Sequence, residues 1–127
     1  MVNKNYTLND IATLFNEKKY KELQLAAIHI LKNNPNNPEA LNSLALSYKY
    51  LGDSTKAKET FIKLVNLGPS QDHFFSNAGN FFYDLGNIDQ ALQCHNHALK
   101  LNPNNLNSLN QIGLAHSNRG KDEEAIK

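Results

Sequence analysis

The fold of this chain is decided by residues 72–105, which read DHFFSNAGNFFYDLGNIDQALQCHNHALKLNPNN. A proline, a glycine and an alanine of this segment each recur elsewhere in the chain at intervals of 34 residues. The recurring residues are Pro35, Pro69 and Pro103, then Gly52, Gly86 and Gly120, then Ala57, Ala91 and Ala125. Three residue types that share one period of this length are typical of a repeat built from paired helices. We therefore predict an all-α chain.

Each repeat is expected to contain a helix, a tight turn, a second helix and a loop that ends at proline. Gly52, Gly86 and Gly120 are expected to form the turns, because glycine takes positive φ without strain. Asp53 or Ser54 is expected to cap the helix that follows the first of these turns.

Apolar residues spaced by three and four predict one inward face on each helix. Gly79 and Gly113 occupy the position of Ala45, where a small residue lets two helices approach closely. The residues expected to face inward are Leu41, Leu44, Ala45, Tyr48, Leu51, Phe75, Ala78, Gly79, Phe82, Leu85, Leu109, Ile112, Gly113 and His116 on the first helices, and Ala57, Phe61, Leu64, Val65, Ile88, Ala91, Leu92, His95, Ala98 and Leu99 on the second.

This pattern resembles the tetratricopeptide repeat over residues 38–127, and the segment quoted above is the most similar to that family. The resemblance implies one domain over residues 1–127, in which about 3.5 helix pairs stack as a right-handed superhelix. The implied repeats are residues 4–37, which are degenerate, 38–71, 72–105 and 106–127, which are truncated.

The first repeat departs from the family pattern at three positions. Ile11 stands where the later repeats have a small residue, Lys18 where they have glycine, and Leu23 where they have alanine. A divergent end repeat is expected, because a terminal repeat faces solvent on one side.

The fourth repeat is expected to be incomplete, because only residues 122–127 are left for its second helix. We expect the chain to be a fragment of a longer protein. The face of the fourth repeat near Ile112 and Ala115 is then uncovered, which predicts self-association through this C-terminal face or fraying of the helix.

The composition is that of a protein with nearly balanced charge. Charged residues make up 20% of the chain and the formal net charge is +1, so no nucleic-acid partner is expected. No apolar run is long enough to cross a membrane, and no signal peptide is indicated. A single cysteine, Cys94, excludes an internal disulfide and favours a cytoplasmic protein.

No catalytic, metal or cofactor site is predicted. The histidines and Cys94 lack the spacing of a ligand set, because Cys94, His95 and His97 do not converge on one ion when they lie on a helix. His95 and His116 occupy positions held by aromatic residues in other repeats and are interpreted as packing residues. The basic run at residues 18–21 is interpreted as a solvated turn.

The first helices of tetratricopeptide arrays line a concave groove, so the resemblance directs attention to their outward residues. These are rich in amides and almost uncharged, and amides can pair with an extended peptide backbone through both donors and acceptors. The residues predicted to contact a peptide are Asn42, Ser43, Asn77, Asn80, Tyr83, Asn110 and Gln111.

Two groups within the family sharpen this prediction. Chaperone-binding members hold a C-terminal carboxylate with Lys and Arg, and the corresponding positions here are uncharged, so the resemblance implies no such clamp. O-GlcNAc transferase arrays line the groove with asparagine, and Asn77 matches that ladder with Ser43 and Gln111 beside it. The positions that correspond to the clamp are Leu8, Ala12, Ser43, His73 and Asn77.

The sequence therefore predicts a non-catalytic scaffold that binds a protein or an extended peptide. Three alternatives stay open at this point. The array could be the N-terminal part of a larger enzyme such as a glycosyltransferase, it could be a self-assembling module, or its amide-rich face could simply be solvated.

Overall fold

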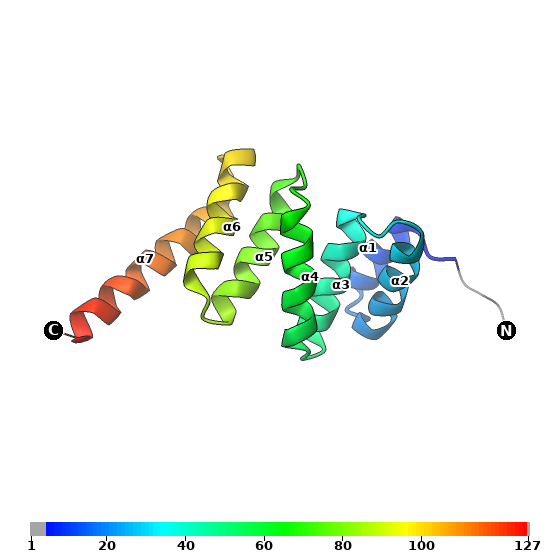
Figure 1. The fold of residues 1–127 in the computed structure, drawn as a ribbon, viewed down its shortest axis with the longest axis horizontal. Helices are drawn as coiled ribbons and strands as arrows, with labels where there is room; N and C mark the ends of the chain where they lie inside the picture. Colours follow the sequence, from blue (N-terminus) through cyan, green and yellow to red (C-terminus); the bar gives the residue numbers. More distant parts are fainter. Residues whose placement is uncertain (1–4, 127) are drawn as a thin grey trace. The chain divides into compact units, whose positions relative to one another are not determined.

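The computed structural model describes the backbone of residues 5–126 and the side chains of residues 5–118. The described residues form seven helices and no strand, as Figure 1 shows, so the predicted all-α fold is confirmed. Two compact units divide the chain between Gly68 and Pro69, at the loop marked by the second repeated proline. We call them the N-terminal unit, Met1–Gly68, and the C-terminal unit, Pro69–Lys127. That residues 1–127 act as one domain stays a prediction.

The N-terminal unit contains four helices joined by short turns. They are α1 (Leu8–Asn16), α2 (Tyr20–Asn33), α3 (Pro38–Tyr50) and α4 (Ser54–Asn66). Consecutive helices pack against each other, and α1 also contacts α3. Each of three helices begins at a polar cap, because the side chains of Thr7, Asn37 and Asp53 accept hydrogen bonds from the first turns of α1, α3 and α4. Of the two residues expected to cap α4, Asp53 performs this role.

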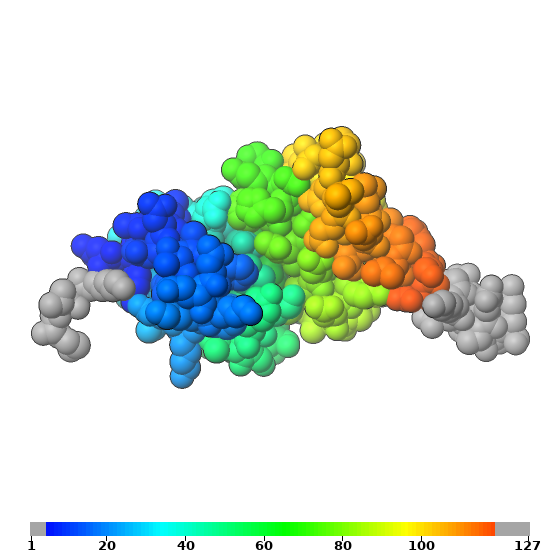
Figure 2. All heavy atoms as spheres, turned by 180° about the vertical axis from the view of Figure 1, so that it is seen from behind, coloured from blue at the N-terminus to red at the C-terminus, as the bar shows by residue number. Residues whose placement is uncertain are grey.

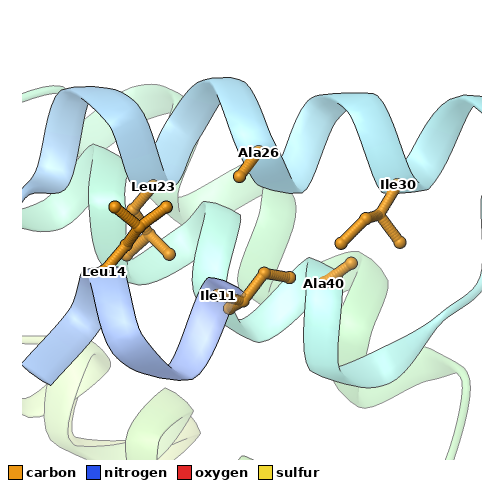
Figure 3. Packing of buried hydrophobic residues seen from close by; sticks show 6 residues of the cluster. All are labelled: Ile11, Leu14, Leu23, Ala26, Ile30 and Ala40. Carbon is orange, nitrogen blue, oxygen red and sulfur yellow. The ribbon is translucent and has the colours of Figure 1, made fainter. Parts of the chain in front are cut away.

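One part of the core of the N-terminal unit is a cluster of small and branched apolar side chains. Figure 3 shows the side chains of α2 pointing toward those of α1 and toward Ala40 at the start of α3. Ala26 and Ala40 are fully buried, and their small size lets α2 and α3 approach closely. The cluster consists of Ile11, Leu14, Leu23, Ala26, Ile30 and Ala40.

The turns between paired helices all use left-handed backbone. Gly52 and Gly86 have φ of 89° and 85°, which confirms the turns predicted at these glycines. Lys18 has φ of 59° at the equivalent place in the first repeat. The first repeat therefore keeps the turn geometry without the glycine, at the cost of a side chain in a conformation that L-residues disfavour.

The C-terminal unit contains α5 (Asp72–Asp84), α6 (Ile88–Leu101) and α7 (Leu106–Ile126). Helix α6 packs between α5 and α7, and α5 also contacts α7. The turn expected at Gly120 is not formed, because α7 continues through this residue as one helix. A helical glycine costs only about 1 kcal/mol relative to alanine, and the residues after Gly120 are mostly good helix formers.

Several residues expected to face inward are exposed. Leu51 and Leu85 are the C-cap residues of α3 and α5, and 42% and 40% of their surface is exposed, because each lies beyond the last turn that packs. Leu109, Gly113 and His116 are exposed on α7, since no described helix covers that side. Ala115, expected at the uncovered face, is instead 2% exposed.

The two glycines predicted to permit close helix approach differ in their surroundings. A Cβ on Gly79 would lie 2.5–2.8 Å from three atoms of the His95 imidazole, whereas a Cβ on Gly113 would meet no atom within 4 Å. The prediction is therefore confirmed at Gly79, where α5 and α6 meet, and is wrong at Gly113. The reason is that α6 packs on α5, whereas no second helix of the fourth repeat packs on α7 in the described structure.

We expect Lys18→Gly to stabilise the protein by about 0.5–1 kcal/mol, because it removes a Cβ from a left-handed residue while leaving the exposed turn otherwise unchanged. Urea unfolding followed by circular dichroism measures the change. Lys18→Ala is the matched control, since it removes the charge and keeps the Cβ. An equal gain in Lys18→Ala would show that the lysine charge, and not its backbone, is the source of the effect.

We expect Gly79→Ala to destabilise the protein by about 1–3 kcal/mol, because the buried imidazole of His95 cannot move away from the new methyl group. The control is Gly113→Ala, which adds the same group to open space on α7 and should stabilise by up to about 1 kcal/mol. Thermal unfolding of both variants measures the difference. Similar losses in the two variants would contradict the role given to His95.

Candidate functional site

The candidate site is the surface that α5 and α7 share in the C-terminal unit. Figure 2 shows the described part of α7, in orange, at the surface beside the green and yellow-green spheres of α5. Of the five predicted contact residues here, Asn77, Asn80 and Tyr83 lie on α5 and are half-buried. Asn110 is exposed and Gln111 half-buried on α7.

Two hydrogen bonds join the helices across this surface. Asn107 donates from Nδ2 to Oδ1 of Asn80 over 3.4 Å, and Asn118 donates from Nδ2 to the hydroxyl of Tyr83. The predicted contact set omitted Asn107 and Asn118. Their partners lie 27 and 35 residues away in sequence, so aligning the chain on its 34-residue period does not reveal these pairs.

We call this surface the amide face. Its side chains can donate to and accept from a ligand along both helices, and the face carries few charges. The amide face consists of Asn77, Asn80 and Tyr83 of α5 and Asn107, Asn110, Gln111 and Asn118 of α7.

The remaining two predicted contact residues lie elsewhere and are buried. Asn42 and Ser43 of α3 are only 8% and 6% exposed, although we expected both to face outward. Every residue of α3 from Ala40 to Ser47 is buried, because this helix packs against α1, α2 and α4 at once. Asn42 and Ser43 therefore offer almost no surface to a ligand.

A set of hydrogen-bonded polar side chains lies beneath the amide face. The Oγ atoms of Ser76 and Ser108 are 2.7 Å apart, and the Oγ of Ser108 is also 2.7 Å from Nδ1 of His95. Asn105 donates from Nδ2 to Oδ2 of Asp72 and to the Oγ of Ser76, over 2.7 and 2.8 Å.

Two further bonds complete this set, which we call the polar network. Asn102 donates from Nδ2 to Oδ2 of Asp72 over 3.2 Å, and the backbone N–H of Ser108 donates to Oδ1 of Asn105 over 2.9 Å. Asn105 thereby caps α7 while its amide nitrogen reaches α5. The polar network consists of Asp72, Ser76, His95, Asn102, Asn105 and Ser108.

Burial sets the protonation of the titratable groups in and beside the network. It lowers the pKa of His95 to about 4, so this imidazole is neutral at pH 7. It raises the pKa of the Cys94 thiol to about 11, so the thiol is protonated and unreactive. Burial raises the pKa of Asp72, but hydrogen bonds from Asn105 and Asn102 outweigh that effect and hold the pKa below its usual value.

The positions that correspond to a carboxylate clamp carry no Lys or Arg. Leu8, Ala12 and His73 are exposed and Asn77 is half-buried. Ser43 is buried, as described above. Electrostatic capture of a terminal carboxylate therefore has no permanent positive charge at these positions.

The described residues offer neither a metal centre nor a membrane span. Within the described residues, no three His, Cys, Asp or Glu side chains are grouped so that they could hold a metal ion. None of the helices in the described part of the chain is long and apolar enough to cross a membrane.

Known proteins similar to this chain are repeat proteins. A model of the TPR repeat matches residues 79–120, and a model of the tetratricopeptide repeat matches residues 27–59. The chain is 28% identical over 98 residues to Hsp70-Hsp90 organizing protein 3 of Arabidopsis thaliana, a match that covers 77% of this chain and 18% of that protein. The chain spans less than a fifth of the length of the curated relatives that it matches first.

Solved structures agree with the family models. The first TPR domain of human RPAP3 superimposes with a TM-score of 0.81 at 21% identity, over 92% of each chain. The first TPR of Spaghetti (RPAP3), solved with the HSP90 peptide SRMEEVD, gives a TM-score of 0.79 at 21% identity, over 88% of this chain and 89% of that chain. These solved structures show the same fold as this chain, and the family models, which match both of its units, identify it as a tetratricopeptide-repeat array.

Proposed function

We propose that this chain is a non-catalytic scaffold that binds an extended peptide segment of a protein partner along the amide face. The observation that carries this proposal is the pairing of Asn80 with Asn107 and of Tyr83 with Asn118, which joins two helices into one continuous polar surface. The similarity to an Hsp70-Hsp90 organizing protein and to a repeat domain solved with an HSP90 peptide supports peptide binding.

The chemistry of the amide face suits the backbone of a peptide. Each amide side chain offers two N–H donors and a carbonyl acceptor, so a row of them can satisfy the alternating donors and acceptors of an extended chain. Asn77, Asn80, Tyr83, Asn110 and Gln111 are the proposed contacts. Asn42 and Ser43 are left out of this set because they are buried.

The partner is proposed to be held without recognition of a terminal carboxylate, because the clamp positions lack Lys and Arg. A peptide segment inside a longer chain fits such a surface as well as a C-terminal tail does. We further propose a cytoplasmic protein without a nucleic-acid or membrane partner. If the chain associates with itself, we propose that it does so through the exposed side of α7 at Leu109 and His116. If it is instead an array within a larger enzyme, it would present the same amide face.

The first test selects ligands from a phage-displayed library of random 12-residue peptides and measures the enriched peptides by fluorescence anisotropy. The double variant Asn77→Ala/Asn80→Ala should weaken binding by about tenfold, since each lost hydrogen bond is worth about 0.5–1.5 kcal/mol. Its helicity by circular dichroism should not fall.

The matched control for this test is Asn66→Ala/Asn96→Ala. These two exposed asparagines lie on α4 and α6, which contribute no residue to the amide face, and their loss should leave binding unchanged. Enriched peptides that bind the Asn77/Asn80 variant as tightly as the parent would refute the proposed contacts. A collapse of helicity would show that these asparagines are structural.

The second test uses the peptide SRMEEVD with a free or an amidated C-terminus. We expect amidation to change the affinity of the parent protein by less than about twofold, because the positions that correspond to the clamp carry no Lys or Arg. His73→Lys/Asn77→Arg places two cations on α5 and should make the free acid bind at least about tenfold more tightly than the amide. A parent protein that already discriminates tenfold would reveal a carboxylate site that these positions do not explain.

A further inference from the structure

Few of the described side chains of α7 are buried against its unit. Among its described side chains, only Ser108 and Ala115 are buried, with 0% and 2% of their surface exposed. Three leucines of the same helix, Leu106, Leu109 and Leu114, are 71%, 46% and 50% exposed. Burial of one methyl group and one hydroxymethyl group contributes far less than burial of a leucine does. The polar network therefore supplies much of what holds α7 in place.

The corresponding contact in the N-terminal unit is apolar. Helix α2 packs on α3, and Ala26, Ala27 and Ala40 of these helices each have 0% of their surface exposed. Ala27 and Ala40 stand 68 residues before His95 and Ser108, two repeats earlier, so the equivalent positions hold two buried alanines there and a hydrogen-bonded pair in the C-terminal unit. The polar contact is thus a property of this repeat and not a requirement of the repeat geometry.

The hydrogen bonds of the network run in one direction. Asp72 is ionised and can only accept, so Asn105 must present its amide nitrogen to Asp72 and Ser76 and its oxygen to the N–H of Ser108. Ser76 accepts from Asn105, and the only other bond described for Ser76 leads to Ser108, so its own proton goes there. Ser108 then donates to Nδ1 of His95, whose proton must be on Nε2.

A protonated His95 conflicts with this arrangement. Its Nδ1–H would point at the proton of Ser108, and its Nε2 already lacks a partner in the described structure. The ring is 1% exposed, so water cannot solvate the new charge. Protonation can be relieved only if His95 gains access to solvent.

We propose that neutral His95 is the positioning group that docks α7 against α5 and α6. The docking holds Asn107 and Asn118 of α7 against Asn80 and Tyr83 of α5. The part of this inference that concerns ligand binding rests on the function proposed above, and the part that concerns the helix does not.

Other titratable groups near His95 do not make the docking of α7 depend on pH in the way that His95 does. From α5, Asp72 is separated from the imidazole by Asn105, Ser76 and Ser108 and keeps its charge at mildly acidic pH because its pKa is lowered. From α6, Cys94 has a raised pKa and stays neutral, and His97 lies against the ring of Phe75. From α7, His116 is exposed.

The sign of the pH dependence follows from the burial of His95. Its pKa is about 4 when α7 is docked, and about 6.5 when the ring is in water. The released form therefore binds a proton more readily, so docking is fully stable above about pH 6.5 and weakens as the pH falls toward about 4.

Hydrogen exchange measured on the whole chain tests this inference. The opening constant of the α7 amides, corrected for intrinsic exchange, should rise by up to about 30-fold between about pH 7.5 and about pH 5. The α6 amides should stay more protected than those of α7. In the double variant His95→Phe/Ser108→Ala, this rise of the α7 opening constant at low pH, the pH step, should disappear. Phenylalanine is chosen for position 95 because Phe61 occupies the equivalent position one repeat earlier. Alanine is chosen for position 108 because the Ser108 hydroxyl would lose its acceptor when His95 is replaced.

His116→Gln is the matched control, because it removes an exposed histidine from α7 and should leave the step unchanged. If the α7 and α6 amides opened with the same constant at both pH values, the two helices would open together, and the inference that α7 docks separately would be wrong. A pH step retained in the His95 variant would overturn the role of His95.

Peptide binding provides the second measurement. A phage-selected peptide that needs the amide face should bind the parent less tightly at about pH 5, with no such loss in His95→Phe/Ser108→Ala. If α7 opens as expected while peptide affinity does not change, the proposed function fails at α7 and the docking inference stands. If the affinity falls equally at about pH 5 in the parent and in His95→Phe/Ser108→Ala, the docking inference fails for its part that concerns ligand binding.

Discussion

The left-handed backbone at the turns is the constraint on which the rest of the structure depends. Lys18, Gly52 and Gly86 each reverse the chain within a few residues, so that α1 lies on α2, α3 on α4 and α5 on α6. Every apolar contact within a pair exists because this reversal brings two inward faces together. Helix α7 has no such reversal over its described length, and its outer leucines stay exposed as a result.

The 34-residue period predicted those features that depend on local backbone preferences. Positive φ at Gly52 and Gly86 follows from residue type, because glycine tolerates it best. The close approach at Gly79 follows from the same reasoning, since a small residue there makes room for His95. Residue type could not predict that Lys18 takes the same conformation, because that depends on the packing of α1 on α2 overriding a local preference.

Features that depend on neighbouring helices were not predictable from the period. Alignment shows that Asn42 and Asn110 are equivalent positions, yet Asn42 is buried in a helix with three neighbours and Asn110 is exposed on α7. The bond between His95 and Ser108 joins residues only 13 apart, and no repeat elsewhere contains this pair. Such contacts depend on which side chains meet in three dimensions, and no single aligned position records that.

The side-chain amide of Asn105 connects α5 with the first turn of α7, and an isosteric change would turn its N–H donors into acceptors. Hydrolysis of this amide to aspartate consumes water and releases ammonia; it keeps the shape of the side chain but replaces the NH₂ donors by an oxygen that can only accept. The new carboxylate would face that of Asp72 across 2.7 Å, and Ser76 would lose the donor that orients the chain of hydrogen bonds. Chemical ageing at this single asparagine would therefore act on the attachment of α7 to α5.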